Sequence, residues 1–180
     1  MADVNLKDSG KVIKHGGGIL ILSECDDAGG SVVADQTTMP FIEVTEFTDE
    51  LTSEIYRDET GNQVRKVYQD RTVQLNVTLM QTDADTIAFI RSAETKYYQL
   101  YYKMSKTGDM NAKTQELFGA ICQITPAVKI TSGTKRLPIE ILFLENQASI
   151  TISLPNTTYS SIVTADVVIP AKAYYKIVEN

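Results

Sequence analysis

Hydrophobic and polar residues alternate most regularly between Thr72 and Met80. Side chains of a β-strand point alternately to the two faces of its sheet. An extended chain would therefore have one apolar face and one polar face here. The apolar face holds Val73, Leu75, Val77 and Leu79, and the polar face holds Thr72, Gln74, Asn76 and Thr78. The pattern predicts a half-buried strand whose polar face is in contact with water.

A hairpin is predicted just before this strand. Residues 54–58 and 63–69 flank the sequence Glu59-Thr60-Gly61-Asn62. Glycine and asparagine tolerate the positive φ that a tight turn between antiparallel strands requires.

A helix is predicted at about 83–94, directly after the alternating strand. Thr82 can cap it, and Asp83 and Asp85 lie where the helix dipole favours carboxylates. Further strands, rich in Ile, Val, Thr and Tyr, are expected at 19–23, 97–104, 117–124, 137–144, 149–154, 162–169 and 174–178. Residues 1–180 are therefore expected to form a single, mainly β domain with one helix packed on it.

Three segments are expected to lie outside this framework. Residues 25–40 and 105–116 exceed the usual connection of about four to six residues, and long ordered loops are often functional. Residues 1–18 are too polar to supply much core. We predict two contact loops and an N-terminal arm that is exposed or docked on a partner.

Composition and charge narrow the class of protein. The 43% hydrophobic and 22% charged residues are typical of a globular domain. No apolar run is long enough for a membrane span and no secretory signal is apparent, so we expect cytoplasmic synthesis and no membrane anchor. Residues 1–53 hold ten acids against three bases, whereas residues 95–113 hold four lysines against one acid. This asymmetry suits head-to-tail self-association, although solvated surfaces would also account for it.

Residues with catalytic chemistry are scarce. His15 is the only histidine, which leaves little basis for a catalytic triad or a multi-histidine metal site. The chain has no G-x-S-x-G motif and no glycine-rich phosphate-binding motif. Cys25 and Cys122 are best interpreted as two reduced thiols. We expect neither an enzyme nor a cofactor; a small hydrolase would have to depend on His15.

The tyrosine-rich segment 97–102 is the most unusual local feature. On a strand, Tyr97 and Tyr101 would share one face, and Tyr98 and Tyr102 the other. Tyrosine is enriched at protein interfaces, so we expect a mixture of core and subunit contacts. A plain core or a stacking platform for sugars or bases are the alternatives.

The order of elements over about residues 40–104 resembles that of bacteriophage tail tube (major tail) proteins: a hairpin leads into the alternating strand 71–83, then the helix, then the tyrosine-rich strand. Type VI secretion and contractile-tail tube proteins are similar in plan. The resemblance implies a β-sandwich or barrel-like core with one packed helix. It also implies rings of six subunits that stack into a tube conducting DNA, and hence a structural protein of the virion tail.

Specific roles follow from this resemblance. The partners would be further copies of the chain, other tail proteins, and DNA passing through the lumen without specific binding. A DNA-conducting lumen should present uncharged polar or acidic side chains, because basic ones would hold phosphates. Thr72, Gln74, Asn76 and Thr78 meet this requirement, and Tyr97, Tyr101, Asp26, Asp27 and Asp109 are the candidate subunit-interface residues. A carbohydrate-binding or adhesin β-sandwich, with tyrosines as sugar platforms, is the alternative function.

Overall fold

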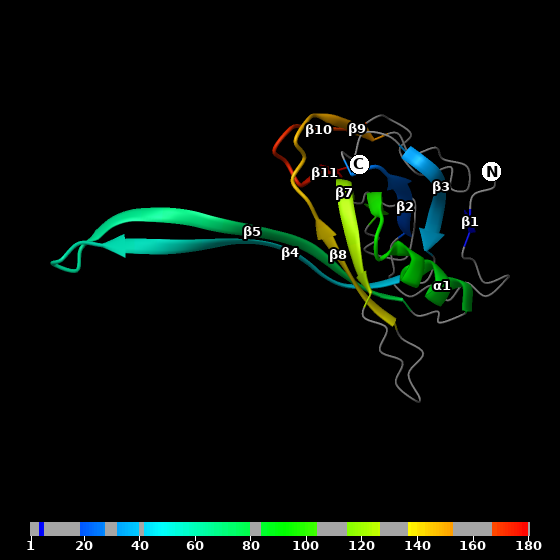
Figure 1. The fold of residues 1–180 in the computed structure, drawn as a ribbon, viewed down its shortest axis with the longest axis horizontal. Coiled ribbons are helices and arrows are strands. Elements are labelled where there is room, and N and C mark those ends of the chain that lie inside the picture. Colours follow the sequence, from blue (N-terminus) through cyan, green and yellow to red (C-terminus); the bar gives the residue numbers. More distant parts are fainter. Residues whose placement is uncertain are drawn as a thin grey trace.

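The protein is mainly β, as expected, with one helix in the part of the chain that the structure describes. This computed structural model describes residues 4–5, 19–27, 32–39, 42–79, 84–103, 115–126, 137–152 and 167–179. Figure 1 shows a rounded body from which one long hairpin extends.

The body is built on a large, strongly curved sheet. Its strands lie in the order β1-β3-β2-β6-β7-β8-β5-β4, with β11 also paired to β7. Neighbours in this sheet are antiparallel, apart from the parallel pair β1–β3. The bounds are β1 Val4–Asn5, β2 Ile19–Cys25, β3 Val32–Met39, β4 Ile42–Arg57, β5 Gln63–Leu79, β6 Tyr97–Lys103, β7 Gln115–Pro126, β8 Leu137–Phe143 and β11 Tyr175–Glu179. The helix α1 spans Ala84–Ala93, within one residue at each end of its predicted range.

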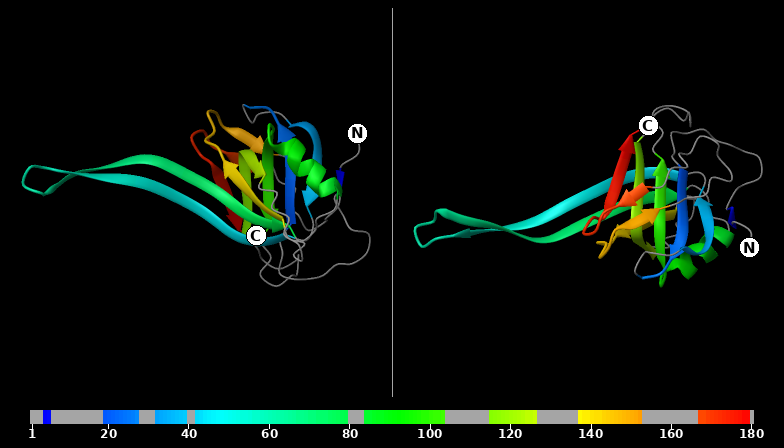
Figure 2. Two further views of the ribbon diagram at one scale, coloured as in Figure 1. Left: turned by 60° about the horizontal axis from the view of Figure 1, so that its bottom comes forward. Right: turned by 90° about the horizontal axis from the view of Figure 1, so that it is seen from above.

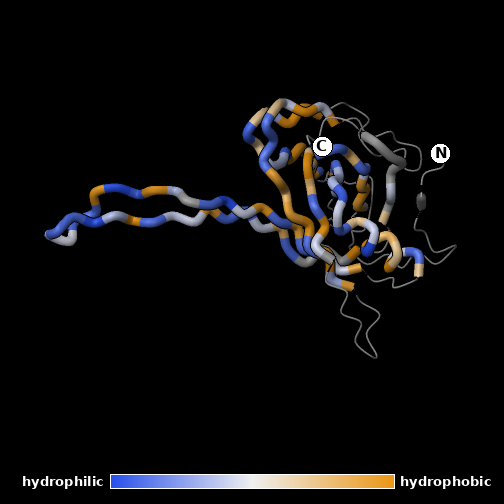
Figure 3. Tube along the Cα trace, in the orientation of Figure 1, coloured by the Kyte–Doolittle hydropathy of each residue, from blue (hydrophilic) through white to orange (hydrophobic). Residues whose placement is uncertain are grey.

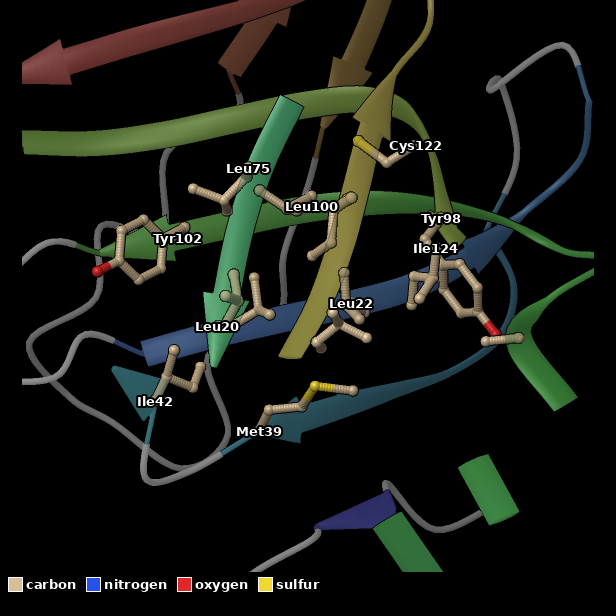
Figure 4. Packing of buried hydrophobic residues seen from close by; sticks show 14 of the residues in the cluster. Leu20, Leu22, Met39, Ile42, Leu75, Tyr98, Leu100, Tyr102, Cys122 and Ile124 are labelled. Atoms are coloured by element: carbon tan, nitrogen blue, oxygen red, sulfur yellow. The ribbon is translucent and has the colours of Figure 1, made fainter. Parts of the chain in front are cut away.

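A second, two-stranded sheet consists of β9 (Ile150–Ile152) and β10 (Val167–Ile169). It produces a second hydrophobic cluster, because Ile150, Ile152 and Ile169 are buried together with Tyr101 and Phe118 of β6 and β7. The larger cluster lies on the other face of the curved sheet, where β2, β5, β6, β7 and β8 meet the helix. Figure 4 shows this packing from close by.

The alternation in β5 is confirmed. Val73, Leu75, Val77 and Leu79 are at most 2% exposed and belong to the larger core. They pair in register with β8, from Val73 opposite Phe143 to Leu79 opposite Leu137. Because side chains alternate along a strand, the polar residues between them point to the outer face of the sheet.

The division of the tyrosine-rich strand into two faces is also confirmed. Tyr98, Leu100 and Tyr102 lie in the larger core, whereas Tyr101 lies in the second cluster and Tyr97 packs against its margin. Both faces of β6 are therefore covered within the subunit.

The prediction of a loop over residues 25–40 is wrong for most of that range. Strand β2 continues to Cys25, and β3 occupies Val32–Met39 and pairs with it. The sequence Asp35-Gln36-Thr37-Thr38 is polar, yet β-branched threonine fits a pleated sheet well, and pairing with β2 and β1 supplies the backbone hydrogen bonds. Of the other two segments, the structure describes only Val4–Asn5 as β1 and Gln115–Glu116 at the start of β7; the remainder lies outside the described residues.

Candidate assembly surface

The hairpin of β4 and β5 is the feature that most sets this fold apart. The two strands pair from Ile42 opposite Leu79 to Arg57 opposite Gln63, so the predicted hairpin exists but is much longer than expected. Strand β8 accompanies β5 only over residues 73–79. Beyond that point the hairpin is two strands wide and extends away from the body in every view (Figures 1 and 2). An isolated two-stranded hairpin is marginally stable in water, so its ends need additional contacts.

The tip is held by side-chain hydrogen bonds. One carboxylate oxygen of Asp58 accepts from the Thr60 backbone NH (2.9 Å), the Thr60 hydroxyl (2.6 Å) and the Asn62 backbone NH (2.8 Å). Arg57 donates to the carbonyl oxygen of Gly61 at 2.9 Å, and Gly61 adopts a φ of 85° that suits glycine. These bonds, that of the Thr60 hydroxyl above all, lower the pKa of Asp58. The turn is thus fixed by its own residues.

The root of the hairpin, where its two strands leave the body, is held by Asp49, Arg71 and Tyr175. Arg71 binds Asp49 in a bidentate manner, with Nε to Oδ1 at 2.8 Å and Nη2 to Oδ2 at 2.6 Å. The Tyr175 hydroxyl donates to Oδ2 of the same carboxylate at 2.7 Å. The hydrogen bond from Arg71 is the main reason why the pKa of Asp49 lies below its usual value. We call these three residues the root network; they join both hairpin strands to β11.

Aromatic rings pack around the root network. Phe47 of β4 meets Tyr175 edge to face at a centroid distance of 5.0 Å, and meets Phe143 of β8 at 6.0 Å. Arg71 lies 5.2 Å from the centroid of the Tyr174 ring. The direction in which the hairpin leaves the body is therefore set by packing as well as by hydrogen bonds.

The outer face of β4, β5 and β8 is polar and acidic. In register, Asn76 lies between Glu46 and Glu140, and the neighbouring row places Gln74 between Thr48 and Leu142. Glu46, Glu50, Thr72 and Glu140 are exposed, whereas Thr48, Gln74, Asn76 and Thr78 are half-buried. Among the outer-face positions 46, 48, 50, 72, 74, 76, 78, 138, 140 and 142 there is no lysine or arginine. This surface, which we call the acidic face, contains the four residues predicted to line a lumen.

The opposite face of the hairpin carries apolar side chains among charged ones, since Arg71 lies opposite Leu51 and Lys66 lies opposite Ile55. Phe47, Leu51 and Ile55 share one parity along β4, and Tyr68 of β5 lies opposite Ser53 on the same face. Phe47 packs on the core, but beyond it Leu51, Ile55 and Tyr68 are 50%, 44% and 59% exposed. Figure 3 shows hydrophobic stretches along both strands far from the body. We call Leu51, Ile55 and Tyr68 the apolar strip.

The predicted interface residues do not gather in one place. Tyr101 is 0% exposed and its hydroxyl donates to Glu116 at 3.0 Å, so its assignment to a subunit interface is wrong. It is buried because β9 and β10 cover the face on which it lies. Asp26 and Asp27 are exposed directly after β2, Tyr97 is half-buried, and Asp109 lies outside the described residues.

Most tyrosines of β6, and the lysines at its two ends, make contacts within the subunit. Tyr98 and Tyr102 are 3% exposed and Tyr101 is 0% exposed, so the half-buried Tyr97 is the one tyrosine of this described strand with a partly accessible ring. Lys96 pairs with Glu24 at 2.8 Å, and Lys103 is buried. Two of the four lysines in residues 95–113 therefore do not contribute to a free basic surface.

The described residues contain no cluster of three or more His, Cys, Asp and Glu side chains able to hold a metal ion. His15 lies outside them. Cys25 and Cys122 are unpaired and buried, and burial raises the pKa of Cys25 to about 12. No helix in the described ranges is long and apolar enough to cross a membrane.

Sequence reasoning missed both the root network and the apolar strip. Asp49 and Tyr175 are 126 residues apart, and no local pattern connects them. The apolar strip had a weak signal, because Leu51 and Ile55 continue the parity of Phe47 toward the turn. That continuity becomes clear only when the register is known.

Comparison with known proteins finds no matching family model and no matching curated protein. Solved structures that are similar include the following three. The sheath/tube terminator of the extracellular contractile injection system PVC, in its extended state, is 12% identical with a TM-score of 0.44, covering 76% of this chain and 94% of that one. The tube-terminating cap of the anti-feeding prophage is 14% identical with a TM-score of 0.42, over 68% and 82%. A chain of the anti-feeding prophage baseplate is 12% identical with a TM-score of 0.38, over 76% and 91%. At these identities, and with TM-scores below 0.5, the likenesses do not assign the chain to a family.

Proposed function

We propose that this chain is a structural, non-catalytic subunit of a phage-tail-type tube, in which six copies form a ring and rings stack around a channel for DNA. The observation that carries the proposal is the acidic face. It is a continuous surface on three strands, opposite the core, without a basic residue at its described positions.

Such a face suits the wall of a DNA channel. Phosphates bind lysine and arginine strongly because each contact releases condensed counterions. Glu46, Glu50 and Glu140 instead repel a phosphate backbone, and the half-buried amides of Gln74 and Asn76 carry no charge. In a ring, each of these positions would be repeated by symmetry, so that DNA meets no site at which it is held.

The open edges of the sheet support assembly on separate grounds. The outer edge of β4 has no neighbour among the described strands, and β5 has none on its β8 side beyond Val73. Exposed strand edges favour pairing with other chains. In a closed ring, strands of neighbouring subunits pair with one another, so no edge stays unpaired. Asp26, Asp27, Tyr97 and Asp109 remain proposed contacts between subunits.

Negative-stain microscopy and sedimentation velocity across a range of protein concentrations test this function. We expect monomers to give way to rings and tubes as the concentration rises. A chain that stays monomeric at the highest concentration reached, while thermal unfolding shows it to be folded, would refute self-assembly. Closed rings that never stack would support ring formation but contradict the proposal that the rings form a tube.

A further inference from the structure

The turn between β10 and β11, residues 170–173, holds the one residue other than glycine that has a positive φ in the described part of the chain. This residue is Lys172, whose φ of 63° lies in the left-handed region. Residues with a Cβ rarely adopt this conformation, because the Cβ comes too close to the following carbonyl oxygen. It persists only where the surrounding structure holds it. Contacts to this turn must therefore favour its left-handed form.

Asn146 supplies such contacts. It lies in the connection between β8 and β9 and is 0% exposed. Its backbone carbonyl oxygen accepts from the NH of Lys172 at 2.7 Å, and its backbone NH donates to the carbonyl oxygen of Ala173 at 3.0 Å. Its side-chain Nδ2 donates to the carbonyl oxygen of Pro170 at 3.4 Å. One buried residue of a distant connection thus binds both ends and the left-handed residue of the turn.

The turn leads directly into two tyrosines that contact the hairpin. The Tyr174 hydroxyl donates to Oε2 of Glu145 at 3.2 Å, and the guanidinium of Arg71 lies over the Tyr174 ring. Tyr175 is the next residue and belongs to the root network. In Figures 1 and 2, β11 lies on the side of the body from which the hairpin extends. The turn and the base of the hairpin are therefore connected through these two side chains.

We propose that Lys172 is a positioning residue for the hairpin: its left-handed turn, held by Asn146, sets the angle at which the hairpin leaves the body. Strand β8 no longer accompanies β5 beyond Val73, and Tyr174 and Tyr175 join the hairpin to the body at that point. A turn that left its left-handed conformation would move both rings, because they follow Lys172 by two and three residues. This role does not require self-assembly and goes beyond the proposed function.

Two substitutions of Lys172 that differ in their tolerance of a positive φ test this role. Lys172→Asn and Lys172→Val both remove the charge, but asparagine adopts the left-handed conformation readily and β-branched valine does not. The matched pair therefore separates the backbone conformation of the turn from the loss of the lysine side chain.

The angle of the hairpin is measured by double electron–electron resonance between two spin labels. One label is placed at Glu59→Cys in the hairpin tip and the other at Arg91→Cys on α1. A second pair, at Arg91→Cys and Glu140→Cys, reports on the body alone. All three positions are exposed, whereas the natural cysteines are buried and their thiols have raised pKa values, so labelling is confined to the introduced residues. Labelled chains are diluted with unlabelled chains, so that only distances within one chain are detected.

We expect one narrow distance between hairpin and body in the natural chain and in Lys172→Asn. In Lys172→Val this distribution should be at least twice as wide, while the distance within the body stays unchanged. If Lys172→Val does not fold, Lys172→Ala, which lacks the β-branch, is compared with Lys172→Asn in the same way.

A hairpin distance as narrow in Lys172→Val as in Lys172→Asn would overturn the role of the turn. Equal broadening in both variants would assign the effect to the lysine side chain, and equal broadening of the body pair would indicate a general loosening; either result also overturns the role. A broad distance in the natural chain would mean that the hairpin has no set angle. Rings and tubes are observed separately by microscopy, so tubes with unchanged hairpin distances would reject this role and leave the proposed function intact.

Discussion

Removal of one hydroxyl from the root network should measurably weaken the fold. In Tyr175→Phe the ring remains, so its contact with Phe47 at 5.0 Å is kept and only the 2.7 Å hydrogen bond to Asp49 is lost. A hydrogen bond to a charged group contributes about 1.5–3 kcal/mol to stability. The Asp49 side chain is 22% exposed, so water replaces part of the lost bond and we expect a loss of about 1 kcal/mol. For a chain of this length that corresponds to a melting temperature about 2–4 °C lower.

The pH dependence of a second variant, Asp49→Asn, gives an independent check. The folded-state pKa of Asp49 is lowered, chiefly by the hydrogen bond from Arg71, so the carboxylate adds stability above its unfolded pKa of about 3.9. That stability is lost as the pH falls through the lowered folded-state pKa. Asp49→Asn should therefore be less stable than the natural chain at pH 7, and the difference should shrink at acidic pH.

Urea unfolding of both single variants and of the double variant, at pH 7 and at the lowest pH where the chain stays folded, measures these effects. The double variant should lose less than the sum of the two single losses, because both changes act on one carboxylate. Additive losses, or an Asp49→Asn effect that is independent of pH, would refute the root network as a stabilising unit.

Three further predictions concern the body and the acidic face. Leu75→Ala should cost about 2–5 kcal/mol because the side chain is fully buried, whereas the neighbouring Gln74→Ala should change the unfolding free energy by less than about 0.5 kcal/mol; equal losses in urea unfolding would mean that the faces are assigned wrongly. Gly119→Ala should destabilise the chain by about 1–3 kcal/mol, because an added Cβ would lie 2.6 Å from both Cys122 Sγ and Phe143 Cε1, and an unchanged melting curve would contradict this contact. Gln74→Lys should leave tubes intact by microscopy but slow genome release, since no acid lies opposite it in the row of Thr48 and Leu142. Release as fast as that of Gln74→Glu particles would place Gln74 outside the lumen.

Local patterns predicted those elements whose physics is local. The period of two around Leu75 identified β5 and its two faces, and the acidic start of the helix identified α1 to within a residue. The period also separated the faces of β6, but it could not show that β9 and β10, some fifty to seventy residues later, cover Tyr101. A pattern of alternation reports which side chains share a face, and only tertiary structure reports what lies against that face.

The hairpin illustrates a second limit. Its pairing shifts register between Val44 and Glu46, between Leu51 and Ser53, and between Tyr56 and Arg57. Each bulge inserts a residue and interrupts the alternation by which strands are recognised, so the sequence indicated only the segment next to the turn. The apolar strip was therefore missed, although Leu51 and Ile55 share one parity along β4.

The root network also determines when the arm acquires its direction during synthesis. The hydrogen bond between Tyr175 and Asp49 cannot form until Tyr175 has left the ribosome, 126 residues after Asp49. At about 5–20 residues per second this is a delay of roughly 6–25 s. After β5 is completed at Leu79, both hairpin strands exist, but the strand that anchors their base does not. A nascent chain therefore presents an arm that still lacks the hydrogen bond from Tyr175 and the packing of its ring on Phe47. The order of synthesis thus makes the root network one of the last features of the described structure that can be completed.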